Sequence, residues 1–264
     1  MKGLKKLLYI MNTLRSEQGC PWDKKQTLET LTPYTLEETY ELIDAIISGN
    51  KAHIEEELGD VLFQVVFYAC IAEEQGWSNF DTIAMKTAEK LIERHPHVFA
   101  DENWSTDQQR LAGWEKIKRD QNKKRMLAGE LTDSASILDD IPKNLPALMK
   151  AKKLQKRAAS VNFDWPDFSF VIDKIDEELL ELKQAISQRD PVHTEEELGD
   201  LLFALVNLGR HLKIDPEIAL EKCNLKFKKR FGYIETQLSQ SGKKPEDSNL
   251  AEMENYWQQA KTLK

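Results

Sequence analysis

The sequence predicts an all-α protein built from two related halves, and three observations support this prediction. The composition is 41% hydrophobic and 31% charged, with only 11 Gly and 9 Pro among 264 residues, which favours helices over a turn-rich β architecture. Apolar residues recur at helical spacing, and no run alternates as a strand would. One acidic pattern also occurs in each half. A chain of this length commonly holds two domains.

In the first half we expect four helices, over residues 3–18, 35–48, 52–75 and 80–94. The second of these is expected to begin at a capping box, in which Thr35 and Glu38 satisfy free N–H groups of the first turn. Gly49 is expected to end it. In the third helix, apolar side chains spaced at i, i+3 and i+4 are expected to form one core-facing stripe, made of Leu58, Val61, Leu62, Val65 and Val66.

The second half repeats this plan. We expect its helices over residues 138–159, 170–187, 194–213 and 217–240, with a last helix after Ser248. Asp215 and Pro216 are typical of an N-cap and a first helical turn. Residues 100–136 are polar and charged, so they offer few positions that hold two bodies together. We place the boundary among them, which gives domains of residues 1–125 and 126–264.

Charge and cysteine content limit the classes of function. A formal net charge of −8 argues against a nucleic-acid surface, which usually needs a basic field. No apolar stretch is long enough to span a membrane. Cys20, Cys70 and Cys223 form neither a paired set nor a metal-ligand spacing. We therefore expect a cytoplasmic protein with no nucleic-acid or membrane partner, in which Cys70 lies in the core.

Four acidic residues recur at the same spacing in both halves. In the first half they are Glu38, Glu41, Glu57 and Asp60, and 140 positions later they are Glu178, Glu181, Glu197 and Asp200. Residues three apart lie on the same side of a helix, so each pair converges, and two crossing helices bring the pairs together. Residues 55–66 and 195–206 around them match at nine of twelve positions.

Carboxylates held around one point repel and raise one another's pKa, and a divalent cation resolves that conflict. Oxygen ligands without His or Cys favour Mg²⁺ or Mn²⁺ over zinc, and Mg²⁺ usually accepts phosphate oxygens in its remaining positions. We interpret each set as a magnesium cage for a nucleoside triphosphate, with Mn²⁺ as a substitute. For a single Glu-Glu-x-x-Glu the alternative is a solvated helix face. The repetition favours the cage, because sequence divergence between the two halves would not preserve carboxylates that only face solvent.

These residues resemble the signature of the MazG family of nucleoside triphosphate pyrophosphohydrolases, Glu-Glu-x-x-Glu followed by Glu-x-x-Asp. The resemblance covers nearly the whole chain, including the tandem arrangement and the Gly-Cys-Pro-Trp-Asp stretch at residues 19–23. It implies four-helix-bundle units completed by homodimerisation, and Mg²⁺-dependent hydrolysis of NTPs and dNTPs to the monophosphate and pyrophosphate. Asn162 stands where the family commonly has Gly, and Asn tolerates a left-handed backbone.

The resemblance also implies roles for individual residues. The eight acidic residues above would be the metal ligands. The substrate-binding residues would be Lys174 and Glu178, the basic pairs Lys90 with Arg94 and Lys226 with Arg230, and the position-matched Trp114 and Trp257. The two tryptophans would stack on a base, and core packing is the alternative for both. The aromatic stretches of the two halves differ, which leaves open whether both sites are active.

The reaction implied is attack of a metal-activated water on the α-phosphorus, with pyrophosphate leaving. Lys226 and Arg230 would stabilise charge on the leaving group, and either Glu177 or Glu178 would orient the water. Two alternatives are a narrower pyrophosphohydrolase acting on dUTP or phosphoribosyl-ATP and a nucleotide-binding scaffold without turnover. A di-iron carboxylate protein would need Glu-x-x-His, and no histidine here follows a Glu at that spacing.

Overall fold

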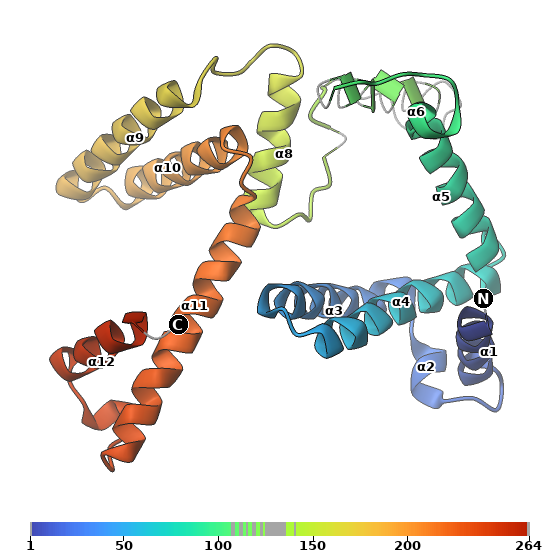
Figure 1. Ribbon diagram of the computed structural model, residues 1–264, viewed down its shortest axis with the longest axis horizontal. Helices are drawn as coiled ribbons and strands as arrows, with labels where there is room; N and C mark the ends of the chain where they lie inside the picture. Colours follow the sequence, from blue (N-terminus) through green and yellow to red (C-terminus); the bar gives the residue numbers. More distant parts are fainter. Residues whose placement is uncertain are drawn as a thin grey trace. The chain divides into compact units, whose positions relative to one another are not determined.

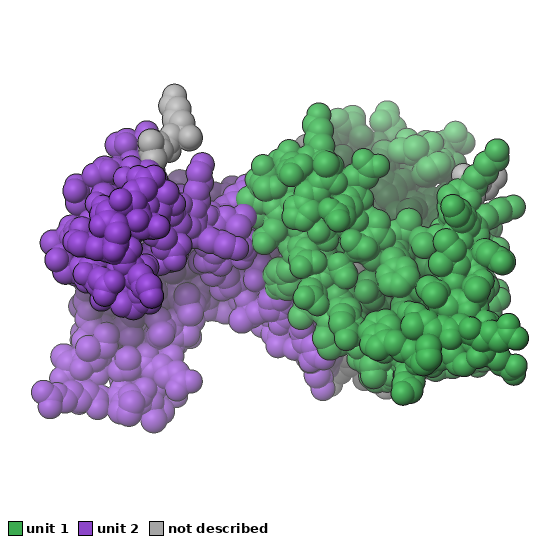
Figure 2. All heavy atoms as spheres, turned by 90° about the horizontal axis from the view of Figure 1, so that it is seen from below, with its two compact units in different colours: residues 1–132 green, residues 133–264 purple. Residues whose placement is uncertain are grey.

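The computed structural model describes residues 2–262 except 107–108, 111–112, 115, 118–119, 122–123, 125–135 and 140. Within these residues every regular element is a helix, which confirms the all-α prediction (Figure 1). The chain divides into two compact units, residues 1–132 and 133–264 (Figure 2). The boundary that we expected after residue 125 lies outside the described residues.

The first unit is organised around a helical hairpin. Its helices are α1 (Lys2–Arg15), α2 (Pro21–Lys25), α3 (Leu28–Ser48), α4 (Lys51–Glu74), α5 (Phe80–Arg94) and α6 (Pro96–Phe99). Helices α3 and α4 pair along their lengths, and α1 packs against α4. Gly49 ends α3, as predicted, in a left-handed conformation with φ of 73°, which costs glycine little. Asn50 then caps α4 by accepting from the amides of Ala52 and His53.

The capping box that we expected at Thr35 is wrong. Helix α3 begins earlier, where Thr27 and Thr30 exchange the two capping hydrogen bonds. Thr35 lies inside the helix, and its hydroxyl donates to the Leu31 carbonyl at 3.1 Å and contacts the Tyr68 hydroxyl at 2.7 Å. Both positions carry a Thr-Leu-Glu sequence, so local pattern does not separate them. Burial of Leu31, which is 1% exposed, favours the longer helix.

The core of the first unit lies between α1, α3 and α4. Its buried members are Met11, Leu31, Val66, Phe67, Cys70 and Ile71. The predicted burial of Cys70 is confirmed, and burial raises the pKa of its thiol to about 11, with a further contribution from Glu74. The stripe expected on α4 is wrong: Leu58, Leu62 and Val65 are exposed, whereas Val66 is fully buried.

The second unit repeats the hairpin. Its elements are α8 (Ala147–Ala159), α9 (Phe168–Gln188), α10 (Pro191–His211), α11 (Pro216–Gln240), the 3₁₀ helix η1 (Pro245–Asp247) and α12 (Leu250–Thr262). Helices α9 and α10 pair as α3 and α4 do, α8 packs against α10, and α11 packs mainly against α12. The helix expected from residue 138 begins only after Pro146, which lacks the N–H of a helix interior. Asp215 caps α11, as predicted.

Two further features bear on the expected compartment and partners. Cys20, Cys70 and Cys223 are all free thiols. Among the described helices, none combines the length and the apolar character that crossing a lipid bilayer requires.

Candidate functional site

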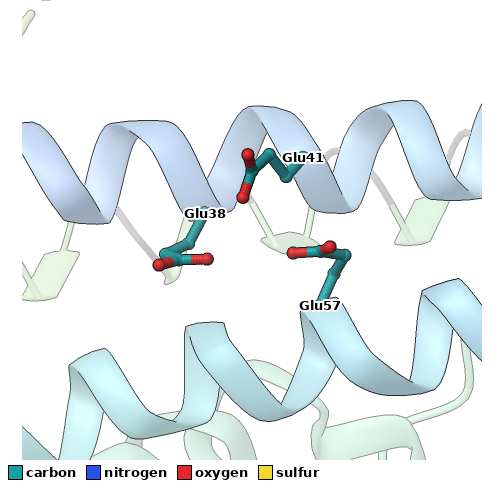
Figure 3. A group of neighbouring side chains, drawn as sticks. All are labelled: Glu38, Glu41 and Glu57. Carbon is teal, nitrogen blue, oxygen red and sulfur yellow. The ribbon is translucent and has the colours of Figure 1, made fainter.

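In the first unit, three carboxylates from the two helices of the hairpin point toward one another (Figure 3). Glu38 and Glu41 come from α3 and Glu57 from α4, and one oxygen of each lies within 4.8 Å of the other two. The fourth predicted residue, Asp60, is outside this group but close enough to influence it. The pKa of Glu38 is raised, chiefly by burial and then by the charges of Asp60, Glu41 and Glu57.

The second unit contains the equivalent group. Glu178, Glu197 and Asp200 have oxygens within 4.8 Å of one another. Here the predicted residue left outside is Glu181, whose pKa is raised by burial and then by the charges of Glu197 and Glu178. Each unit therefore brings three of its four predicted carboxylates together, with the fourth interacting electrostatically with the group. We refer to these groups as the first cage and the second cage.

Each cage also has a histidine that was not predicted. The Nε2 atom of His53 lies 2.8 Å from Oε1 of Glu57, and His193 makes the same 2.8 Å contact with Glu197. Each histidine precedes its glutamate by one helical turn, which places both side chains on one helix face. A residue that holds a carboxylate in this way fixes its orientation toward a metal. The repeated His-x-Glu-Glu-Glu sequence was the signal that could have identified them.

The donor set fits a hard divalent cation. Carboxylate oxygens converge in both cages, and such ligands suit Mg²⁺ or Mn²⁺. In the first cage, Glu57 is only 7% exposed, and its second oxygen, Oε2, is buried without a hydrogen-bond partner in the described structure. Burying an unpaired carboxylate oxygen is costly. A cation would supply the missing interaction and offset both the burial and the carboxylate repulsion that raise the pKa of Glu38.

A cavity of about 770 Å³ adjoins the second cage, which is within the size range of small-molecule sites. Glu178 and Asp200 of the cage line it, together with Lys174. The ammonium of Lys174 lies 2.7 Å from Glu178 and 2.9 Å from Glu177, and these two hydrogen bonds raise its pKa. The cavity's apolar walls come from Leu138, Leu154, Ala158, Phe163, Trp165, Val171, Phe203 and Ala204.

The aromatic stretch after α8 is attached to α10 beside this cavity. Asn162 has the left-handed conformation that it was expected to tolerate, with φ of 65°. The carboxylate of Asp164 accepts a hydrogen bond from Arg210 and lies 3.2 Å from His211. Burial raises the pKa of Asp164, but the hydrogen bond and charge of Arg210 outweigh it, so the net shift is downward. Arg210 also donates to Oδ1 of Asn207 at 2.8 and 3.0 Å.

Corresponding positions of the first unit are filled by its core. Asn207 and Arg210 line the cavity of the second unit. The residues 140 positions earlier are Phe67, which is fully buried, and Cys70, which is 6% exposed. Each unit therefore has its own cage, but the residues beside the two cages differ.

Both members of the basic pair of the first half, Lys90 and Arg94, lie on α5. Lys90 is exposed there, and Arg94 donates to the Gln121 side chain at 2.8 Å. The Arg94 guanidinium also lies 5.6 Å from the ring centroid of Trp114, which is a cation–π distance. Lys90 is therefore open to solvent, whereas Arg94 and Trp114 contact each other.

The second half repeats that contact. The Arg230 guanidinium lies 5.5 Å from the Trp257 ring, and Phe227 packs on the same ring at 5.3 Å. Lys226 and Arg230 line a hollow between α11 and α12. Neither these cations nor Trp257 is among the residues that line the cavity beside the second cage. Within the described part of one chain, Lys226 and Arg230 therefore line a different hollow from Glu178 and Asp200 of the second cage.

Comparison with known proteins defines the class of this one. The family described as the MazG nucleotide pyrophosphohydrolase domain matches residues 26–99 and 169–232, which contain both hairpins and both cages. The chain belongs to this family. It is 48% identical to the nucleoside triphosphate pyrophosphohydrolase of Escherichia coli strain K12, over 99% of this chain and 98% of that one.

Two other relatives extend the comparison. The chain is 45% identical to the nucleoside triphosphate pyrophosphohydrolase/pyrophosphatase MazG of Thermotoga maritima, over 97% of this chain and 94% of that one. It is 43% identical to the nucleoside triphosphate pyrophosphohydrolase of Mycolicibacterium smegmatis, over 57% of this chain and 44% of that one. The likeness to the first two relatives thus spans both units.

Proposed function

We propose that this chain hydrolyses nucleoside triphosphates to the monophosphate and pyrophosphate. The observation that carries the proposal is the second cage, whose Glu178 and Asp200 also line a cavity large enough for a nucleotide. Membership of the MazG family supports the reaction class, because two full-length relatives bear the name of that activity. We expect broad substrate use among NTPs and dNTPs. A restriction to dUTP or phosphoribosyl-ATP is the alternative.

In the proposed site, Glu178, Glu197 and Asp200 hold Mg²⁺, or Mn²⁺ in its place. The bound cation would neutralise phosphate charge and lower the pKa of the attacking water. Lys174 contacts Glu178 and Glu177 together, which keeps these carboxylates in fixed positions. Glu177 lies outside the converging group, so we propose that it orients the attacking water toward the α-phosphorus.

We place catalysis in the second unit. Tyr34 occupies the position in α3 that Lys174 occupies in α9, and Trp22 packs edge-on against it with ring centroids 5.8 Å apart. Phe67 fills the position of the cavity-lining Asn207. The first cage therefore retains carboxylates for a cation, whereas the positions that would admit a nucleoside are occupied by aromatic side chains.

We further propose a homodimer in which the α9–α10 hairpins of two copies form a four-helix bundle. Leu180, Leu198, Leu202 and Leu205 on these helices are all more than 40% exposed. Their burial would contribute about 25 cal/mol per Å² of apolar surface, and a two-fold interface uses the same face of both copies. In this assembly, we propose that Lys226 and Arg230 on α11 of one copy stabilise the charge of the leaving pyrophosphate at the site of the other copy.

The test is pyrophosphate release across all NTPs and dNTPs, measured with Mg²⁺, with Mn²⁺ and with EDTA. Release is expected with either cation and is expected to stop in EDTA. Glu197→Gln should abolish turnover, because it removes a cage ligand, while the circular dichroism of the helices stays unchanged. Turnover that persists in EDTA or in this variant would contradict the assignment. Size-exclusion chromatography with light scattering tests the dimer, and Leu202→Glu should yield a monomer.

A further inference from the structure

The cavity beside the second cage contains a buried amide with one unused acceptor. Gln155 on α8 lines the cavity and is 7% exposed. Its Nε2 atom donates to the backbone carbonyl of Phe203 on α10 at 2.8 Å. Its Oε1 atom is buried and has no hydrogen-bond partner among the described residues. Buried side-chain oxygens in folded proteins almost always have a partner, so this atom requires an explanation.

The orientation of this amide is fixed by its neighbour. A carbonyl can only accept a hydrogen bond, so the NH₂ group of Gln155 must face Phe203. Rotating the amide by half a turn would set two acceptors against each other and break the 2.8 Å bond. The group that remains available is therefore an acceptor, and it selects a ligand that carries an N–H or O–H donor.

The surroundings identify which part of a nucleotide would approach Gln155. The phosphates belong at Glu178 and Asp200, because those carboxylates form the cage. The rest of the cavity has apolar and aromatic walls that suit a flat heterocycle, among them Phe163 and Trp165. Arg210 does not compete as a donor for the acceptor, because its hydrogen bonds go to Asp164 and Asn207.

We propose that Gln155 is a base-binding residue whose Oε1 accepts a hydrogen bond from the base of the substrate. The donor is the exocyclic amino group of adenine or cytosine, or the ring N–H of guanine, uracil or thymine. This inference rests on the proposed function and deepens it by assigning the base to this cavity. Every common base offers such a donor, so the residue recognises a nucleobase without restricting its identity. Gln155 lies outside the residues that the family comparison matches.

The test pairs removal of the acceptor with removal of the donor. Purine riboside triphosphate lacks the amino group of ATP and presents a C–H at that position. In the wild-type protein we expect kcat/KM for ATP to exceed that for this analogue about tenfold, because a site built to hydrogen-bond a substrate rejects one that leaves it unpaired. Gln155→Leu should abolish this preference by lowering the value for ATP. Gln188→Leu, the same change at an exposed position of α9, should keep it.

Binding gives a second readout that needs neither metal nor turnover. In EDTA, calorimetry should show that the wild-type protein binds AMP about tenfold more tightly than purine riboside monophosphate and that Gln155→Leu binds both equally. Absence of pyrophosphate release with a preserved binding preference would refute the proposed function alone. If Gln155→Leu weakened the binding of both nucleotides by the same factor, the inference would be overturned. That result would mean that Gln155 has a structural role or that its Oε1 accepts from a bound water.

Two further outcomes are decisive. The kcat/KM values for 2′-deoxy-ATP and 3′-deoxy-ATP, each divided by the kcat/KM for ATP, should be the same in the wild type and in Gln155→Leu. A change in these ratios would overturn the inference in favour of a sugar hydroxyl as the donor. If Gln155→Leu does not fold, the near-isosteric Gln155→Met replaces it. Equal use of ATP and the purine analogue by the wild-type protein would be sufficient to refute the inference without any variant.

Discussion

The substitution Asn207→Phe places in the cavity of the second unit the residue type that stands at the corresponding position in the core of the first unit. Asn207 lines that cavity, and Phe67 is its fully buried counterpart. The change removes the acceptor of two hydrogen bonds from Arg210 at 2.8 and 3.0 Å, which should cost about 1–3 kcal/mol. Burying the ring should contribute about 1.5–3 kcal/mol. The two effects nearly cancel, so we expect the free energy of unfolding to change by less than about 2 kcal/mol.

Activity should respond far more strongly than stability. The ring would occupy space that we assign to the nucleoside, and a loss of about 3 kcal/mol of binding lowers kcat/KM roughly 100-fold. The assays are pyrophosphate release with several NTPs and urea unfolding of the same preparation. The matched control is Phe67→Asn, which should destabilise the first unit by about 3–5 kcal/mol, as large-to-small core changes do, while leaving kcat/KM near the wild-type value. Unchanged kcat/KM in Asn207→Phe would refute the assignment of the cavity.

Three further predictions concern the second unit. His193→Asn removes the 2.8 Å contact with Glu197 and should raise the Mg²⁺ concentration for half-maximal activity about tenfold, with kcat at saturating Mg²⁺ retained; an unchanged Mg²⁺ titration would exclude the positioning role. A 1:1 mixture of Glu197→Gln and Lys226→Ala that exchanges subunits at random should recover about a quarter of the wild-type activity if each site uses the basic residues of the other copy, because half of the dimers are mixed and each has one intact site; no recovery would place the cage and its basic residues in one chain. Asp164→Asn should lower stability at pH 7 by about 1 kcal/mol, because it breaks the ion pair with Arg210. The lowered pKa of Asp164 means that this difference is complete above about pH 4 and disappears as the pH falls through the folded-state pKa, which urea unfolding at several pH values will measure.

The cages could be predicted because they depend on local geometry. Helical spacing alone places Glu38 beside Glu41, and the repeat identified the partner residues on the next helix. Helix ends marked by a dedicated residue, such as Gly49 and Asp215, were predictable for the same reason. The start of α3 was not, because Thr27 and Thr35 carry similar local signals and burial decided between them.

The cavity could not be predicted because it depends on packing between helices. Whether space remains beside a cage is decided by which side chains of α8 and α10 meet there, and sequence spacing does not report that. The prediction of which face of α4 is buried was wrong for a related reason. Periodicity identifies an apolar stripe, but Leu58 and Leu62 lie on a face that a single chain leaves open, whereas Glu57 is buried against α3.

The persistence of the first cage does not require the first unit to be catalytic. Glu57 has a buried oxygen without a partner, and the pKa of Glu38 is raised by burial and by neighbouring carboxylates. Burying the Glu57 carboxylate beside two others is costly without a cation. A cation held by these carboxylates would therefore stabilise the fold of the first unit whether or not that unit is catalytic. The position of the cavity-lining Asn207 carries no such constraint, because its counterpart Phe67 is fully buried in the core of the first unit, so the carboxylates can be retained in a unit where that position belongs to the core.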